Sequence, residues 1–228
     1  MATETGRSGG GDPQLALPQL SLAALFITAL VTAQVTATKV VAVESPISLP
    51  ITGESITVPA AVFAYAITFF ASDCYAELYG KRAAQYLVNI AFTMNFVLLG
   101  LVWLAIAAPI YEFSPVAQGP FAETLGASTG IVVGSLLAYL VSQNWDVLVF
   151  HRLREATAGK SLWLRNIVST ATSQLLDTVI FITVAFLLFQ GFSPQEAAGL
   201  IIGQYVFKLL LAGVDTPFVY LVVGAVRE

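Results

Sequence analysis

The sequence contains very little cysteine, histidine and charge for a chain of 228 residues. Its single cysteine, Cys74, cannot form an internal disulfide, and one histidine, His151, offers no spacing typical of a metal site. The sequence also lacks a phosphate-binding glycine loop and a nucleophile with a matching base. We therefore expect no metal, no cofactor and no catalytic site, and we expect the chain not to hydrolyse ATP itself.

Charged residues account for 11% of the chain, whereas about a quarter is usual in soluble domains. Hydrophobic residues account for 57%, and the mean hydropathy is +0.81. This composition is typical of an integral membrane protein, which has the lipid bilayer as a partner. The net charge of −4 comes from scattered carboxylates, which argues against a nucleic-acid partner.

Six apolar runs follow a glycine-rich start, and each is near the ~20 residues that span the ~30 Å hydrocarbon core of a bilayer. We predict an all-α, polytopic membrane protein with six transmembrane helices in one domain, residues 19–228. Residues 1–18 are predicted to form a disordered cytoplasmic tail. The predicted helices cover residues 19–43, 58–79, 84–108, 128–150, 166–190 and 197–226.

The basic residues predict the orientation. Eight of the ten lie in the tail, after the second and fourth runs, or at the end of the chain. The connections 44–57, 109–127 and 191–196 contain no Lys or Arg. Because cytoplasmic loops are enriched in these residues, we predict a multi-pass protein of the cell membrane with both termini cytoplasmic. The other two cations, Lys39 and Lys208, lie within apolar runs.

The fifth run carries a carboxylate, Asp177, near its middle. Spacings of three and four place Thr170, Ser173 and Gln174 on the same helix face. A charge at the bilayer centre costs about 2.5–3.5 kcal/mol on insertion scales, and such groups mostly face a bundle interior or a wet cavity. The other helices should therefore supply partners for this face.

The fourth run repeats this pattern, because S-Q-x-x-D-x-x-x-F begins at residue 142 and again at residue 173. Gln143 with Asp146, and Gln174 with Asp177, could each form a donor and acceptor edge for a planar polar ligand. For Asp146 a solvated helix end close to Arg152 is the alternative.

The sixth run places Gln204, Lys208 and Asp215 on one stripe. Lys208 is too far from either end to reach water, so we expect it to pair with Asp177, Asp73 or Asp215. Either this pair belongs to a binding site or it is a purely structural ion pair.

Two further carboxylates, Asp73 and Glu77, lie one turn apart near the end of the second run. Acidic groups are unfavourable near the negative end of a helix, which favours a functional role or a pairing with another helix. The alternative is a plain helix end that terminates at Gly80.

The first run carries a small-residue stripe of Ala29, Ala33 and Ala37. Small residues every four positions allow another helix to approach closely, either within this chain or from a separate membrane subunit. Lys39, at the outer end of the run, could extend to the interface or serve as a counter-ion.

Four segments together resemble the queuosine precursor transporter family, a vitamin-uptake-like, six-helix family of membrane proteins. They are SDCYAELYGKRAA, SQNWDVLVFHRLR, GKSLWLRNIVSTATSQLLDTVIFITVAF and QYVFKLLLAGVDTPFVYLV. The resemblance implies import of 7-cyano-7-deazaguanine or 7-aminomethyl-7-deazaguanine for the modification of tRNA. Nine polar positions match by motif and are the candidate substrate-binding residues: Asp73, Glu77, Gln143, Asp146, Gln174, Asp177, Gln204, Lys208 and Asp215.

Three functions compete at this point. The favoured one is a stand-alone importer of a small molecule. The alanine stripe suggests a second, in which the chain is the substrate-binding membrane subunit of an energy-coupling vitamin uptake system. A membrane enzyme is disfavoured, since no catalytic constellation is present. A homo-oligomer is left open.

Overall fold

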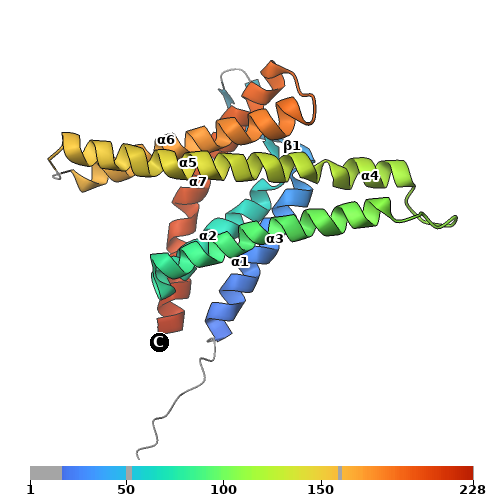
Figure 1. The fold of residues 1–228 in the computed structure, drawn as a ribbon. Helices are drawn as coiled ribbons and strands as arrows, with labels where there is room; N and C mark the ends of the chain where they lie inside the picture. The colour runs from blue at the N-terminus through green and yellow to red at the C-terminus, as the bar shows by residue number, and fades with distance from the viewer. Residues whose placement is uncertain (1–16, 50–52, 159–160, 228) are drawn as a thin grey trace, which may run out of the picture.

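The computed structural model describes residues 17–49, 53–158 and 161–227. The described chain is mostly helical, with α5 and α6 side by side across the view and α1 and α7 running steeply away from them (Figure 1). The elements in chain order are α1 (Leu17–Thr36), β1 (Val40–Leu49), β2 (Gly53–Pro59), α2 (Val62–Tyr79), α3 (Lys81–Ala107), α4 (Gln118–Gly126), α5 (Ser128–Ala156), α6 (Leu162–Ile182), the π-helix η1 (Thr183–Leu188) and α7 (Pro194–Arg227).

Four helical segments in the described residues are long and apolar enough to cross a membrane. They are Leu17–Thr36, Lys81–Ala107, Gln118–Ala156 and Ile167–Leu188. The prediction of a helical membrane protein is confirmed at this level. The count of six spans and the cytoplasmic termini stay predictions, and the predicted disordered tail lies outside the described residues except at residues 17 and 18, which begin α1.

A β-hairpin corrects the prediction at the end of the first apolar run. The sequence predicts a helix through residues 40–43, but α1 ends at Thr36, and Val40 pairs with Pro59 in an antiparallel sheet. The physical reason is the high content of valine and threonine, whose branched side chains favour strands over helices. The two strands lie mostly in the predicted connection 44–57, so the chain is not entirely helical.

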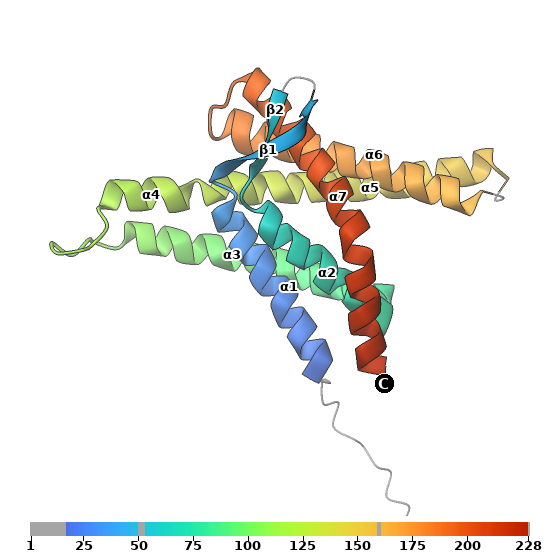
Figure 2. The ribbon, with the colours of Figure 1, turned by 180° about the vertical axis from the view of Figure 1, so that it is seen from behind.

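The hairpin packs against α7 at Gly203. A Cβ at this position would overlap the carbonyl oxygen of Thr57, so only glycine allows β2 to approach α7 this closely. The contact lies one residue before Gln204. Figure 2 shows the hairpin beside the first part of α7.

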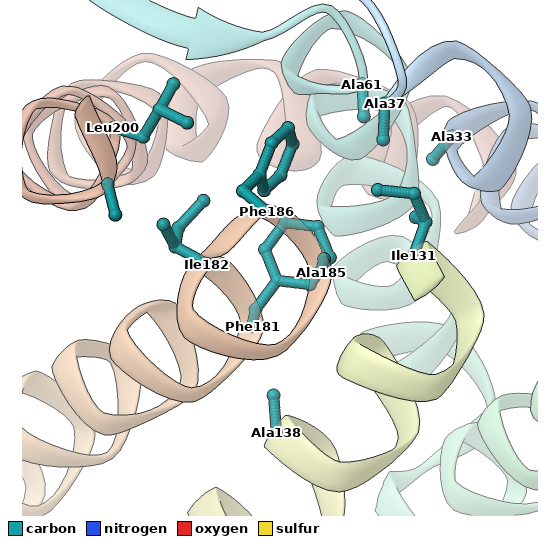
Figure 3. Close-up of a cluster of buried hydrophobic side chains, with 11 residues drawn as sticks. Ala33, Ala37, Ala61, Ile131, Ala138, Phe181, Ile182, Ala185, Phe186 and Leu200 are labelled. Carbon is teal, nitrogen blue, oxygen red and sulfur yellow. The ribbon is translucent and has the colours of Figure 1, made fainter. Parts of the chain in front are cut away.

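The core is built largely from small residues. Ala33 of α1 and Ala37, which directly follows that helix, are fully buried and pack with Ala61, Ile131 and the residues around Phe186 (Figure 3). Ala29 is also buried. The stripe on the first run therefore serves internal packing, and it is not a free surface for a separate subunit.

Candidate functional site

Helices α5 and α6 form an antiparallel pair that small residues hold close together. A Cβ added at Gly134 would lie 3.2 Å from the Phe181 carbonyl oxygen of α6 and 3.2 Å from the Ala185 Cβ of η1, which continues α6. A Cβ at Gly130 would lie 2.5 Å from the Phe189 Cβ, directly after η1. Glycine at these two positions allows the close approach. The pair is seen side by side in both ribbon views (Figures 1 and 2).

The two copies of S-Q-x-x-D-x-x-x-F meet across this pair in a crossed arrangement. The Ser142 hydroxyl donates to Asp177 over 3.5 Å, and the Ser173 hydroxyl donates to Asp146 over 3.3 Å. Each serine thus contacts the aspartate of the other copy. Because the helices are antiparallel, the sequence repeat becomes a local two-fold arrangement in space.

An ion pair joins α6 to α7. The Lys208 Nζ lies 2.7 Å from an oxygen of Asp177 and also donates to the Thr178 hydroxyl over 3.1 Å. The side chains of Lys208 and Asp177 are 13% and 27% exposed. Of the three carboxylates expected as partners of Lys208, Asp177 is the one that lies against it. Both charged groups of this pair are largely removed from solvent.

The ion pair lines a cavity of about 280 Å³ to which α1, α2, α3, α5, α6 and α7 all contribute. Hydroxyl, amide and charged groups form one part of the lining, and aromatic rings form another. The polar residues are Gln34, Thr68, Ser72, Gln85, Ser135, Ser142, Gln143, Gln174, Asp177, Gln204 and Lys208. The aromatic residues are Phe26, Tyr65, Phe69, Phe92, Tyr139 and Phe181.

Two buried amides in this lining have unused hydrogen-bonding groups. Gln34 is fully buried, and its Oε1 accepts from Ser135 over 3.3 Å, but its Nε2 has no partner among the described residues. Gln204 is 3% exposed, and its Oε1 likewise has none. Buried polar groups are nearly always paired, and leaving one unpaired costs about 1–3 kcal/mol. A donor and an acceptor are thus available for a ligand in the same cavity.

One wall of the cavity carries an ordered aromatic contact. The rings of Phe92 and Tyr139 lie 4.2 Å apart between centroids, at 31° to one another. The Tyr139 hydroxyl accepts from the Gln85 amide over 2.7 Å, which fixes the ring. Such a wall can cover the face of a flat ligand while the amides meet its edge.

Five of the nine residues predicted from the sequence line this cavity: Gln143, Gln174, Asp177, Gln204 and Lys208. Asp146 instead accepts from Ser173 outside the lining, and Asp73 and Glu77 are exposed on α2. The structure does not describe the side chain of Asp215.

Sequence reasoning missed Gln34, Ser135 and Tyr139 among the lining residues. Gln34 carried the clearest signal, because it is an amide in the middle of an apolar run, as Gln174 is. No group of three or more metal-binding side chains occurs in the part of the chain that the structure describes.

Comparisons with known proteins give a consistent result. The family described as "Putative vitamin uptake transporter" matches residues 59–222. The "Probable queuosine precursor transporter" of Bacillus subtilis (strain 168) is 35% identical over 162 residues, which cover 68% of this chain and 67% of the relative.

Two other relatives carry similar names. The "Queuosine precursor transporter" of Escherichia coli (strain K12) is 27% identical over 151 residues, 66% of this chain and 65% of the relative. The "Probable queuosine precursor transporter" of Haemophilus influenzae is 36% identical over 84 residues, 36% of this chain and 34% of the relative. No solved structure matches the chain.

Proposed function

Because the chain belongs to the vitamin uptake transporter family, we propose that it imports a queuosine precursor, a 7-deazaguanine base, through the cavity between its helices. The chain is accordingly a multi-pass membrane transporter and not an enzyme. We further propose that it lies in the cell membrane with both termini cytoplasmic, on the strength of its basic loops.

The observation that carries the proposal is the pair of unused amide groups in one cavity. A deazaguanine presents a ring carbonyl, a ring N–H and an amino group along its edge. The Gln34 Nε2 can donate to the carbonyl, and the Gln204 Oε1 can accept from an N–H. A site built on such bonds rejects analogues that lack these groups, because its own buried amides would then stay unpaired.

The size of the cavity supports the same ligand. Small-molecule sites usually enclose about 300–1,000 Å³, and this one, at about 280 Å³, is at the lower limit. That volume suits a flat two-ring base better than a nucleoside or nucleotide. The aromatic wall of Phe92 and Tyr139 supplies a surface on which such a ring can stack.

Uptake in a strain unable to make 7-deazaguanines tests the proposal, with modified tRNA as the readout. We expect the wild-type chain to restore modification, and Asp177→Asn and Lys208→Met to lose it. Each variant removes one partner of the 2.7 Å ion pair and alters the cavity lining. Lys39→Met is the matched control, because it removes the other cation of the apolar runs without touching the cavity.

Failure of the wild-type chain to restore modification, despite normal insertion into the membrane, would disprove the proposed import. Normal uptake by both ion-pair variants would instead leave import standing and show that the cavity is not the site. Membrane insertion is checked by the amount of full-length chain in washed membranes.

A further inference from the structure

The end of the α5–α6 pair where α5 finishes and α6 begins carries more positive than negative charge. Arg152 and Arg154 lie in the last two turns of α5, and Arg165 is the fourth residue of α6. Of the described residues in these turns, Glu155 alone is acidic. In both ribbon views this end extends past the turn between α2 and α3, and no other described helix flanks it (Figures 1 and 2).

The guanidinium group of Arg165 is held against α5 at this end. Its Cζ lies 5.1 Å from the centroid of the Phe150 ring, a contact in which the face of an aromatic ring attracts a cation. Its Nε and Nη1 are enclosed by protein, and neither has a hydrogen-bond partner in the part of the chain that the structure describes. The contact with Phe150 therefore fixes the side chain but does not neutralise its charge.

No carboxylate of the described residues lies within ion-pair distance of Arg165. On α5, Asp146 accepts a hydrogen bond from Ser173, and Glu155 is exposed beside Arg154 in a hollow at the surface. A partly enclosed charge that lacks a partner is unfavourable. An anion from outside the chain would therefore stabilise this end of the pair.

The level of this end along the helices corresponds to the surface of the bilayer. The apolar span Ile167–Leu188 begins two residues after Arg165. On α5, Val147 and Leu148 are exposed apolar residues about one turn before Arg152. Because one helical turn rises about 5.4 Å, the arginines lie just beyond the surface that faces the lipid tails, at the level of the headgroups.

We propose that this end of the α5–α6 pair binds the phosphate group of an anionic lipid through Arg165 and Arg154. Phe150 and Arg154 are one turn apart on the same face of α5, and Arg165 lies over Phe150, so the two guanidinium groups border one surface. Nη2 is the nitrogen of Arg165 that is not enclosed, and it donates to a phosphate oxygen. The lipid is thus a structural partner of the chain, and this inference does not depend on the proposed function.

Native mass spectrometry of the full chain, purified in detergent, tests the proposal by titration with two lipids. Phosphatidylglycerol carries a net negative charge, whereas phosphatidylcholine carries none. We expect wild-type protein to bind phosphatidylglycerol at least about tenfold more tightly, because two arginines contribute to its recognition. Arg165→Gln should weaken the binding of phosphatidylglycerol by about fivefold or more, since it removes one of them.

Arg82→Gln is the matched control. Arg82 is exposed at the start of α3, outside the α5–α6 end, and its replacement removes the same charge from the chain. We expect it to change the affinity for phosphatidylglycerol by less than about twofold. Inorganic phosphate is the second control, because it offers the same ligand group without lipid tails, and we expect it not to displace the lipid.

Equal affinities of the wild type for the two lipids would overturn the inference. Equal losses in Arg82→Gln and Arg165→Gln would also overturn it, because the binding would then reflect the overall charge of the protein. Displacement of the lipid by inorganic phosphate would assign the site to a free anion instead. Should Arg165→Gln fail to fold, Arg154→Gln replaces an exposed residue and should still weaken binding by about twofold or more. An unchanged affinity in that variant would contradict the proposal.

Discussion

The two copies of the S-Q-x-x-D-x-x-x-F pattern place the same residues in different surroundings. In the α6 copy, Asp177 meets Lys208 at 2.7 Å and lines the cavity. In the α5 copy, Asp146 accepts a hydrogen bond from Ser173, lies outside the cavity lining and has no ion pair within the described part of the chain. The crossed serine contacts are common to both. The two copies differ in their contact with α7, because Lys208 of α7 pairs with Asp177 and not with Asp146. A third helix therefore determines which of the two aspartates belongs to an ion pair in the cavity.

Neutralising each aspartate in turn is the strongest way to test this difference. Asp177→Asn leaves Lys208 as a largely buried, unpaired cation, since its side chain is only 13% exposed. Removing one partner of a fully buried pair costs about 3–5 kcal/mol, and for this partly exposed pair we expect about 2 kcal/mol. Asp146→Asn should cost about 1 kcal/mol or less, the worth of one hydrogen bond. Thermal unfolding of the detergent-solubilised protein measures both.

The double variant Asp177→Asn with Lys208→Met is the control for this measurement. It removes the stranded cation, so most of the lost stability should return although uptake does not. Equal losses for Asp177→Asn and Asp146→Asn would show that the two copies are energetically alike, and that α7 does not distinguish between them.

The sequence was informative about these groups because polar residues are costly inside apolar runs. That cost singles out Asp177 and Lys208 and limits the partners of Lys208 to three carboxylates, but only the packing of α7 against α6 selects one of them. Asp146 also lies within an apolar run, yet it does not line the cavity. The sequence does not separate it from Asp177, because helix periodicity assigns residues to a face and does not say which neighbouring helix covers that face.

Other features could not be read from hydropathy. Residues 40–43 are apolar enough to extend the first run, yet they form a strand, since hydropathy does not distinguish a buried helix from a hairpin packed on one. Gln34 is not among the residues predicted from the sequence, and an amide within an apolar helix commonly serves helix packing. That its Nε2 has no partner among the described residues follows only from the packing of the six helices that line the cavity.

Gly134 tests whether close packing of α5 on α6 holds the crossed contacts in register. A methyl group at this position would lie 3.2 Å from the Phe181 carbonyl oxygen of α6 and 3.2 Å from the Ala185 Cβ of η1, which forces the helices apart by a few tenths of an ångström. We expect Gly134→Ala to cost about 1 kcal/mol and to lower uptake, because the contacts between Ser142 and Asp177 lengthen. Thermal unfolding and the tRNA assay measure the two effects.

Gly100→Ala provides the matched control in α3. A Cβ at Gly100 meets nothing within 4 Å, so alanine there should be neutral or stabilise the helix by roughly 0.5–1 kcal/mol. If Gly134→Ala were as stable and as active as Gly100→Ala, the register of α5 and α6 would not depend on this glycine.

The smallest expected effect concerns a third carboxylate, Glu196, at the start of α7. Its Oε2 accepts from the Ser193 hydroxyl over 2.7 Å and from the Ser193 backbone N–H over 2.8 Å, and its own N–H donates to the Ser193 hydroxyl over 3.3 Å. This capping box satisfies backbone donors that the helix start leaves unpaired. The bonds from the Ser193 hydroxyl and backbone lower the pKa of Glu196 from its ordinary value of 4.5.

A lowered pKa means that the folded chain binds this proton less readily than the unfolded chain. The stabilisation is therefore complete above pH 4.5 and is lost as the pH falls through the lower folded value. Glu196→Gln should flatten this part of the pH profile of thermal unfolding, and uptake at pH 7 should not change because the residue lies outside the cavity.

Asp177→Asn should have the opposite pattern, with uptake lost at pH 7 although the acid-dependent step near Glu196 is retained. An unchanged acid profile in Glu196→Gln would assign that step to another carboxylate, and a loss of uptake at pH 7 would place the start of α7 in the transport path.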